Sequence, residues 1–93
     1  TISDRIEVPK WFPKKSKHPE FRDLKRETPK TPIQGGGGLR KRWKDKKGRI
    51  YEWDYQHGRL EKYDKAGKHH LGEYNPKTGE MITLPNPKKK VEP

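Results

Sequence analysis

The chain has 93 residues, with 24 Lys and Arg against 13 Asp and Glu, which gives a net charge of +11. This length allows one domain at most, and with hydrophobic residues at 25% its core must be thin and rich in aromatics. The absence of Cys excludes disulfides and thiolate metal sites, and no apolar run is long enough for a transmembrane helix or a signal-peptide core. So basic a surface suits nucleic acid, an anionic membrane or an acidic protein, but no helical apolar stripe accompanies the cations, which argues against a membrane.

Residues 1–38 differ in composition from the rest of the chain, because five prolines interrupt them and four consecutive glycines close them. Proline fixes φ and lacks an N–H donor, so a central strand is not expected here. One short helix is predicted over residues 19–27, where a proline suits the first helical position. Phe21 and Leu24 would then share a face and dock on a sheet. The segment is therefore predicted to be an N-terminal arm with a short helix and a glycine hinge.

Glycines recur after residue 39 at spacings of 10, 9 and 12 residues, each inside a turn-like cluster. Strand-sized segments lie between them, which is typical of an antiparallel meander. The predicted strands cover residues 39–44, 49–56, 59–64, 69–74 and 80–84. With a basic tail they make residues 39–93 the β core, so the predicted fold class is mainly β, an antiparallel sheet meander preceded by the proline-rich arm.

The hairpin around Gly58 decides which side chains share a face of this sheet. A two-residue turn at His57-Gly58 would place Asp54 opposite Glu61 and keep the apolar side chains together. A three-residue turn would mix Arg59 and Glu61 with the aromatics, so the two-residue turn is preferred. Two carboxylates side by side would raise the pKa of one toward the range that a general base needs. The predicted faces are Tyr51, Trp53, Tyr55 and Leu60 on one side, and Glu52, Asp54, Glu61 and Tyr63 on the other.

Asp54, His57 and Glu61 surround this single turn, and two carboxylates with an imidazole suffice for acid–base chemistry without a metal. Cleavage of RNA by its own 2′-hydroxyl needs a base, an acid for the leaving 5′-oxygen and positive charge for the phosphorane. Glu61, His57 and a nearby Lys or Arg fit these roles in that order, with Asp54 orienting the imidazole. The alternative is that the carboxylates only pair with surface cations and His57 is a turn residue, since the spacing alone is a weak motif.

A dense basic cluster surrounds Trp43 and continues into the next turn. Cations interleaved with an indole suit phosphate contacts together with stacking on an unpaired base. The alternatives are a Lys-rich edge strand that deters aggregation and, for the tail, a solvated end. The predicted RNA-binding residues are Arg40, Lys41, Arg42, Lys44, Lys46, Lys47, Arg49, Lys88 and Lys90.

The adjacent pair His69-His70 invites interpretation as a metal site, joined by His57 and Glu61. Neighbouring residues on a strand point to opposite faces, so both imidazoles cannot easily bind one ion. No resident metal and no other cofactor is therefore predicted. A metal-dependent nuclease that uses His57, His69 or His70 stays an alternative, and it would lose activity with a chelator.

Seven short runs occur in this order: Thr28-Pro-Lys-Thr-Pro32, Gly35-Gly-Gly-Gly38, Arg40-Lys-Arg-Trp43, Ile50-Tyr-Glu-Trp-Asp54, Gln56-His-Gly58, His70-Leu-Gly72 and Pro76-Lys-Thr-Gly79. Through them the chain resembles, over about two-thirds of its length, the C-terminal cytotoxic domain of cloacin and the ribosomal-RNA-cleaving E-group colicins. The resemblance implies a highly twisted antiparallel sheet after a short helix. It also implies a metal-independent ribonuclease that cuts 16S ribosomal RNA once in the decoding site and so blocks translation.

The resemblance assigns the family's catalytic Asp, His and Glu to Asp54, His57 and Glu61, and a nearby tyrosine to Tyr63. The family uses an arginine in the Pro-x-Pro-Lys segment of the tail, where this chain has Lys89. Lysine keeps the charge but loses the planar fork. Arg59 stands where the family tends to carry an acid, which could compensate.

The resemblance also implies a larger toxin, released from the producing bacterium and acting in the cytoplasm of the target cell. A start at Thr1-Ile2-Ser3 without an initiator Met fits a fragment of such a protein. The implied partners are the bacterial 30S subunit, with its 16S rRNA as substrate, and an acidic cognate immunity protein as inhibitor. The isolated domain is expected to be a monomer without a membrane span. The alternative function is a non-catalytic RNA- or ribosome-binding module, which needs the cations but not the catalytic group.

Overall fold

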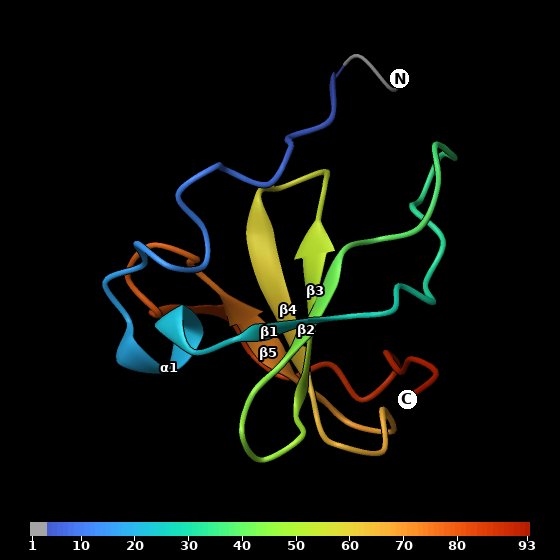
Figure 1. The fold of residues 1–93 in the computed structure, drawn as a ribbon. Helices are drawn as coiled ribbons and strands as arrows, with labels where there is room; N and C mark the ends of the chain where they lie inside the picture. Colours follow the sequence, from blue (N-terminus) through green and yellow to red (C-terminus); the bar gives the residue numbers. More distant parts are fainter. Residues whose placement is uncertain (1–3) are drawn as a thin grey trace.

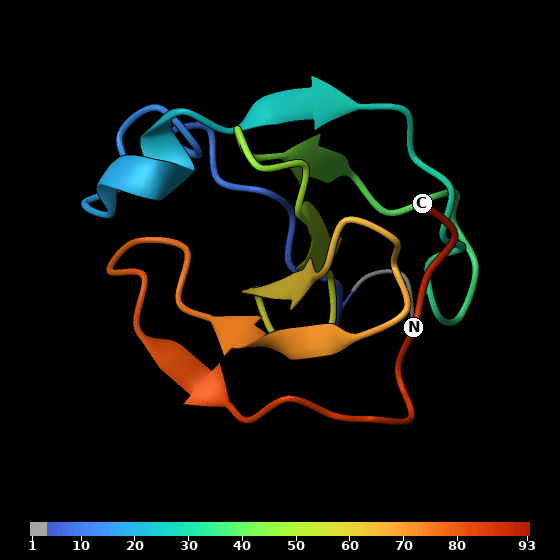
Figure 2. The ribbon, with the colours of Figure 1, turned by 90° about the horizontal axis from the view of Figure 1, so that it is seen from below.

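The computed structural model describes residues 4–93, which form one six-stranded antiparallel sheet whose strands follow chain order (Figure 1). The elements are α1 (Pro19–Arg22), β1 (Lys25–Glu27), β2 (Arg42–Lys44), β3 (Ile50–Asp54), β4 (Arg59–Tyr63), β5 (His70–Tyr74) and β6 (Met81–Thr83). The sheet curves so strongly that β1 and β6 lie on opposite sides of the molecule, with the N-terminal segment passing between them (Figure 2). The predicted mainly-β meander is confirmed, with all five predicted strands present. Within the described part of the chain, no helix has the length and apolar character needed to cross a membrane.

The predicted helix over residues 19–27 was too long, because α1 ends at Arg22 and residues 25–27 form β1 instead. A helix this short has little stability of its own. An extended β1 satisfies the open edge of β2 through backbone pairing, with Arg26 opposite Trp43. Phe21 and Leu24 are nevertheless both buried in the core, as the sequence predicted.

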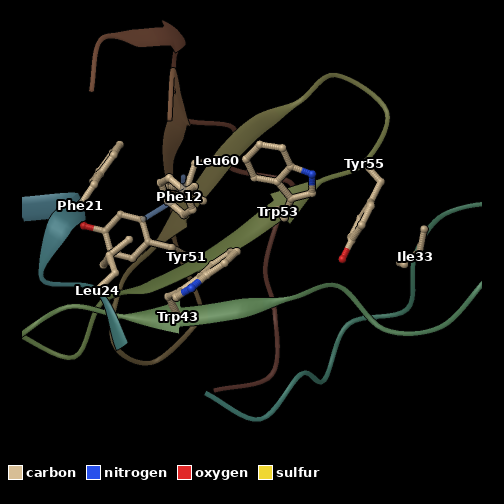
Figure 3. Packing of buried hydrophobic residues seen from close by; sticks show 9 residues of the cluster. All are labelled: Phe12, Phe21, Leu24, Ile33, Trp43, Tyr51, Trp53, Tyr55 and Leu60. Atoms are coloured by element: carbon tan, nitrogen blue, oxygen red, sulfur yellow. The ribbon is translucent and has the colours of Figure 1, made fainter. Parts of the chain in front are cut away.

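The proline-rich arm supplies part of the hydrophobic core. Phe12 lies in the middle of the aromatic cluster, with its ring edge-on to Trp43 at 5.2 Å between centroids (Figure 3). Edge-to-face pairs of this kind add to the gain from burying the rings. Ile6 of the arm makes two hydrogen bonds with the sheet: its N–H donates to the carbonyl of Tyr55 at 2.7 Å, and its carbonyl accepts Trp53 Nε1–H at 2.8 Å. The core cluster consists of Phe12, Phe21, Leu24, Ile33, Trp43, Tyr51, Trp53, Tyr55 and Leu60.

The predicted glycine hinge is a closed loop in the structure. Pro32 and Leu39 form a bridge at its base, and Ile33 N–H donates to the carbonyl of Gly38 at 2.9 Å. All four glycines have φ between 89° and 115°, a region that side chains rarely adopt. The four-glycine run therefore allows a tight reversal that brings Arg40 back toward the sheet.

The hairpin between β3 and β4 has a different register from the one predicted. Trp53 lies opposite Leu60 and Glu52 opposite Glu61, so the connection is a four-residue loop over residues 55–58. The two-residue turn was wrong because the Asp54 side chain accepts backbone N–H groups inside a wider loop, as described below. A shift of two residues leaves each strand side chain on its predicted face. We call Tyr51, Trp53 and Leu60 the apolar face, and Glu52, Asp54, Glu61 and Tyr63 the charged face.

The tail after β6 returns across the molecule to cover part of the charged face. Val91 N–H donates to the carbonyl of Gly67 at 2.8 Å, and Asn86 N–H donates to Nδ1 of His70 at 2.9 Å. The charged face is consequently buried although its side chains are polar, with Glu52 and Glu61 almost fully removed from solvent.

Candidate active site

The loop between β3 and β4 carries His57, whose imidazole is held in place by Asp54. Asp54 Oδ1 accepts the backbone N–H groups of Gln56 and His57, at 2.8 and 3.2 Å, which sets the shape of the loop. Asp54 Oδ2 lies 2.8 Å from His57 Nδ1. An acceptor at this position keeps the proton on Nδ1, because an ionised carboxylate cannot donate. The His57 side chain remains 51% exposed, so its other ring nitrogen is open to a substrate.

Glu61 lies on β4 and is buried, with its side chain only 2% exposed. Its Oε1 is 2.6 Å from His70 Nε2, and its Oε2 accepts a hydrogen bond from Lys89 Nζ at 3.1 Å. His70 Nδ1 already accepts the N–H of Asn86, so the ring proton of the neutral imidazole is on Nε2 and points at Glu61. Burial and then the charge of Lys89 lower the pKa of His70, which favours this neutral form.

A second carboxylate, that of Glu73, faces Glu61 across β4 and β5. Burial, followed by a hydrogen bond to Glu73, raises the pKa of Glu61 to about 7. Burial also acts to raise the pKa of Glu73, but hydrogen bonds from Glu61 and Thr83 and the charges of Lys89 and Arg59 lower it to about 2. The sequence had paired Glu61 with Asp54. The longer β3–β4 loop places Glu52 opposite Glu61 instead of Asp54, and the β4–β5 pairing places Glu73 on the other side of Glu61.

Tyr63 and Lys89 both reach the neighbourhood of Glu61. Tyr63 is on the same face of β4, its ring packs edge-on against His70 with 5.2 Å between centroids, and burial raises its pKa. Lys89 contacts Glu61 directly, as described above, and remains 42% exposed. The lysine therefore brings a cation to the site from the tail, with its outer side open to an anionic ligand.

Sequence reasoning missed Glu73 altogether and considered His70 only as a metal ligand. On a regular strand these two side chains would point to opposite faces. A bulge opposite Lys62 and Tyr63 changes this, with Gly72 at φ 112°, so that both lie on the face of Glu61. The only signal in the sequence was a glycine inside a strand, which is compatible with a bulge but does not locate it.

The metal alternative finds partial support in geometry. Among residues 4–93, Asp54, His57 and Glu73 place ligand atoms within 4.8 Å of one another. Two of these groups already bond to each other, and Glu73 accepts from Arg59 Nη1 at 3.5 Å, so we interpret the cluster as a hydrogen-bonded group. His69 and His70 point apart as predicted, since His69 bonds Asp64 at the surface whereas His70 is buried against Glu61.

One predicted RNA contact is wrong. The Arg42 side chain is 1% exposed, and its Nε and Nη2 atoms donate to Glu52 Oε2 at 3.1 and 2.7 Å. Arg42 is therefore a buried structural partner and offers nothing to a phosphate. The side chain turns inward because β2 alternates, with Glu52 directly opposite on β3.

Apart from Arg40, which is described below, the other predicted cations divide into two groups. Three of them are paired with acids, Lys44 with Glu27, Lys46 with Asp23, and Arg49 with Asp45 and Glu20. Ion pairs at the surface are weak and can exchange for phosphate contacts. The remaining lysines are exposed residues with no ion pair among the described residues: Lys41, Lys47, Lys88 and Lys90.

A cavity of about 460 Å³ adjoins Asp54 on the side of the arm. Arg40 lines it, and the Nε atom of Arg40 is buried without a hydrogen-bond partner in the described part of the chain. The Arg5 guanidinium lies 4.5 Å over the Tyr55 ring at the same cavity. A hollow that offers the Arg40 guanidinium beside the Asp54–His57 pair can accept an anionic group.

Comparisons with known proteins agree on one family. The domain family described as Cytotoxic matches residues 11–92. Over 71 residues, or 75% of this chain, the sequence is 55% identical to colicin E3 and 54% identical to cloacin and to colicin-E6, all from Escherichia coli. The chain spans only 13% of the length of each of these relatives.

Proposed function

Because the chain belongs to the Cytotoxic domain family, we propose that it is a metal-independent endoribonuclease that cuts 16S ribosomal RNA once in the decoding site and so blocks translation. One observation carries the proposal. A held, exposed imidazole and a buried carboxyl with a pKa of about 7 each lie beside Glu73. A group that titrates near neutral pH is suited to proton transfer under physiological conditions.

In the proposed reaction Glu61, in its ionised form, accepts the proton of the ribose 2′-hydroxyl. The 2′-oxygen attacks the phosphorus, and the bond to the 5′-oxygen breaks. His57 donates a proton to that leaving oxygen, so the products are a 2′,3′-cyclic phosphate and a 5′-hydroxyl. Asp54 holds the imidazole in place through the 2.8 Å contact.

Lys89 supplies positive charge for the phosphorane and also controls access to the base. In the free protein its ammonium group lies on Glu61 Oε2. A phosphate entering the site would attract this ammonium group outward, since it is partly exposed, and would uncover the carboxylate. Tyr63 packs on His70 and so holds in place the imidazole that donates a hydrogen bond to Glu61.

Substrate binding rests on the net charge of +11 and the exposed lysines. Phosphate contacts draw the RNA to the surface and fix its orientation without reading its sequence. The cavity beside Asp54 is the proposed place for a nucleotide next to the scissile bond, with Arg40 for its phosphate.

The proposed context is a larger toxin, released from the producing bacterium, that delivers this domain to the cytoplasm of a target cell. An acidic immunity protein is the proposed inhibitor, because a complementary field speeds association with so basic a protein. Its association rate should fall steeply with added salt.

The function is tested by incubating the chain with intact bacterial ribosomes and separating the RNA. A single new fragment from the 3′ end of 16S rRNA, formed equally with and without EDTA, is the expected result. Ribosome binding without any cut would indicate the non-catalytic binding module instead, and loss of the cut with EDTA would indicate a metal-dependent nuclease.

A further inference from the structure

Glu73 on β5 lies at the centre of the candidate site. Its backbone is paired with that of Glu61, and one of its carboxylate oxygens comes within 4.8 Å of ligand atoms of both Asp54 and His57. It thus connects the group that would accept a proton with the group that would donate one. Glu73 is itself buried, with little contact with solvent to screen its charge.

The surroundings of the Glu61–Glu73 pair favour one shared proton. From the tail, Lys89 donates to Glu61; from β5, His70 donates to it as well. From β4, Arg59 donates to Glu73, and Tyr63 lies beside the pair. Two neighbouring buried carboxylates cannot both ionise freely, because the second charge is opposed by the first.

The remaining neighbours do not remove this repulsion. Glu52 on β3 lies opposite Glu61, but Arg42 neutralises it through its own buried ion pair. Asp54 is already bonded to His57. The proton between Glu61 and Glu73 is therefore the most direct means of limiting negative charge at this position.

We propose that Glu73 is a positioning residue of the active site that shares one proton with Glu61 and thereby governs when Glu61 is free to act as a base. The proposal rests on the proposed ribonuclease function for its catalytic consequence, but not for the shared proton itself.

The sign of the effect follows from the charges. An ionised Glu73 opposes ionisation of Glu61, so Glu61 keeps its proton up to about neutral pH. Removing that charge should let Glu61 ionise at lower pH. The ascending limb of the pH–rate profile should then move to lower pH, so that at pH 6 the ionised fraction rises by up to about tenfold. A weaker base should at the same time lower the plateau rate at high pH.

The test compares the full 93-residue chain with Glu73→Gln and with a matched control, Glu80→Gln, which removes one exposed carboxylate. Carboxyl carbon chemical shifts, followed by NMR against pH, report the titration midpoint of Glu61 whether or not the chain cleaves RNA. The midpoint should fall by about one pH unit or more in Glu73→Gln and should stay in place in the control.

The pH dependence of ribosome cleavage is then measured for the same variants. In Glu73→Gln the ascending limb of the pH–rate profile should shift to lower pH together with the titration midpoint of Glu61. An unchanged Glu61 midpoint would overturn the shared proton, and a shifted midpoint with an unchanged limb would overturn the positioning role.

Failure of the wild-type chain to cleave would refute the proposed function while leaving the NMR result to decide the shared proton. If Glu73→Gln does not fold, Glu73→Asp keeps the charge at a shorter reach, and a Glu61 midpoint identical to wild type despite the displaced carboxylate would equally contradict the proposal.

Discussion

The apolar and charged faces of the β3–β4 hairpin are both buried, yet they serve different purposes. The apolar face packs against the arm through Phe12 and Phe21, and its two polar groups, the Tyr51 hydroxyl and the Trp53 indole N–H, donate to Asp45 and to the carbonyl of Ile6. The charged face holds Glu52, Asp54 and Glu61, and each of them has a specific partner. Burial of apolar area stabilises the fold, whereas burial of charges is costly and creates groups with altered proton affinity. The comparison indicates that stability comes mainly from one face, while the other holds the residues of the proposed reaction.

The largest effect on stability should come from truncating Phe12, the arm residue that packs against the apolar face. Phe12→Ala removes a buried ring and leaves a cavity, which costs about 3–5 kcal/mol in the free energy of unfolding. Leu84→Ala is the control, because Leu84 is exposed. Urea unfolding followed by tryptophan fluorescence measures both, and a loss in Phe12→Ala no larger than in the control would mean that the arm does not contribute to the core.

On the charged face, breaking the buried pair of Arg42 and Glu52 should cost about 3 kcal/mol, because Arg42→Met leaves an uncompensated carboxylate. The double change Arg42→Met with Glu52→Met should recover most of that loss, since two apolar side chains need no partner. Recovery would place this pair among the structural members of the charged face. Loss of ribosome cleavage in the folded double variant would instead give the pair a part in the reaction.

Removal of the His57 imidazole should affect the cleavage rate much more than the stability. His57→Ala is expected to lower the rate of ribosome cleavage at least ~100-fold, the loss typical of a missing general acid. Its free energy of unfolding should change little, because the side chain is half exposed. Gln56→Ala in the same loop is the control for the rate. A large loss of stability in His57→Ala would assign His57 to the fold rather than to the chemistry.

The pH dependence of stability should separate the carboxylates of the charged face. The pKa of Glu61 is about 7 in the folded chain against 4.5 as the reference value, so its favourable contribution is present below about pH 4.5 and is lost as the pH rises to 7. This loss is on the order of 2 kcal/mol and should be absent from Glu61→Gln. Glu73, with its pKa lowered to about 2, contributes in the opposite direction, above about pH 4.5. Urea unfolding of wild type and Glu61→Gln at pH 5 and pH 7.5 checks the sign. An equal change in the free energy of unfolding between the two pH values in both proteins would contradict it.

The smallest effect is expected at the exposed cations. Lys41→Gln with Lys47→Gln should weaken ribosome association and reduce its salt dependence by up to about two units of slope, one for each lost phosphate contact. The cleavage rate at saturation should change little. The exposed Lys10→Gln and Lys14→Gln in the arm serve as the matched pair, and an equal change of slope there would show that only net charge matters.

Much of the fold could be predicted from spacing and alternation, while several site contacts could not. Alternation placed Tyr51 and Trp53 on one face and Glu61 on the other, and this survived a wrong loop length because the shift was an even number of residues. The partner of Glu61 depended on registers set by the Asp54-capped loop and by the bulge at Gly72. Neither has a reliable signal in a single sequence. The burial of Arg42 was hidden for the same reason, since a basic run does not show which of its members points inward.

The end groups of the cut RNA test most directly whether the charged face performs acid–base chemistry. Ribosomes treated with the wild-type chain should yield one 16S rRNA fragment pair, with a 2′,3′-cyclic phosphate on one end and a 5′-hydroxyl on the other. His57→Ala and Glu61→Gln should each nearly abolish these ends while remaining folded. A 3′-hydroxyl with a 5′-phosphate at the cut, or undiminished cleavage by both variants, would contradict the account.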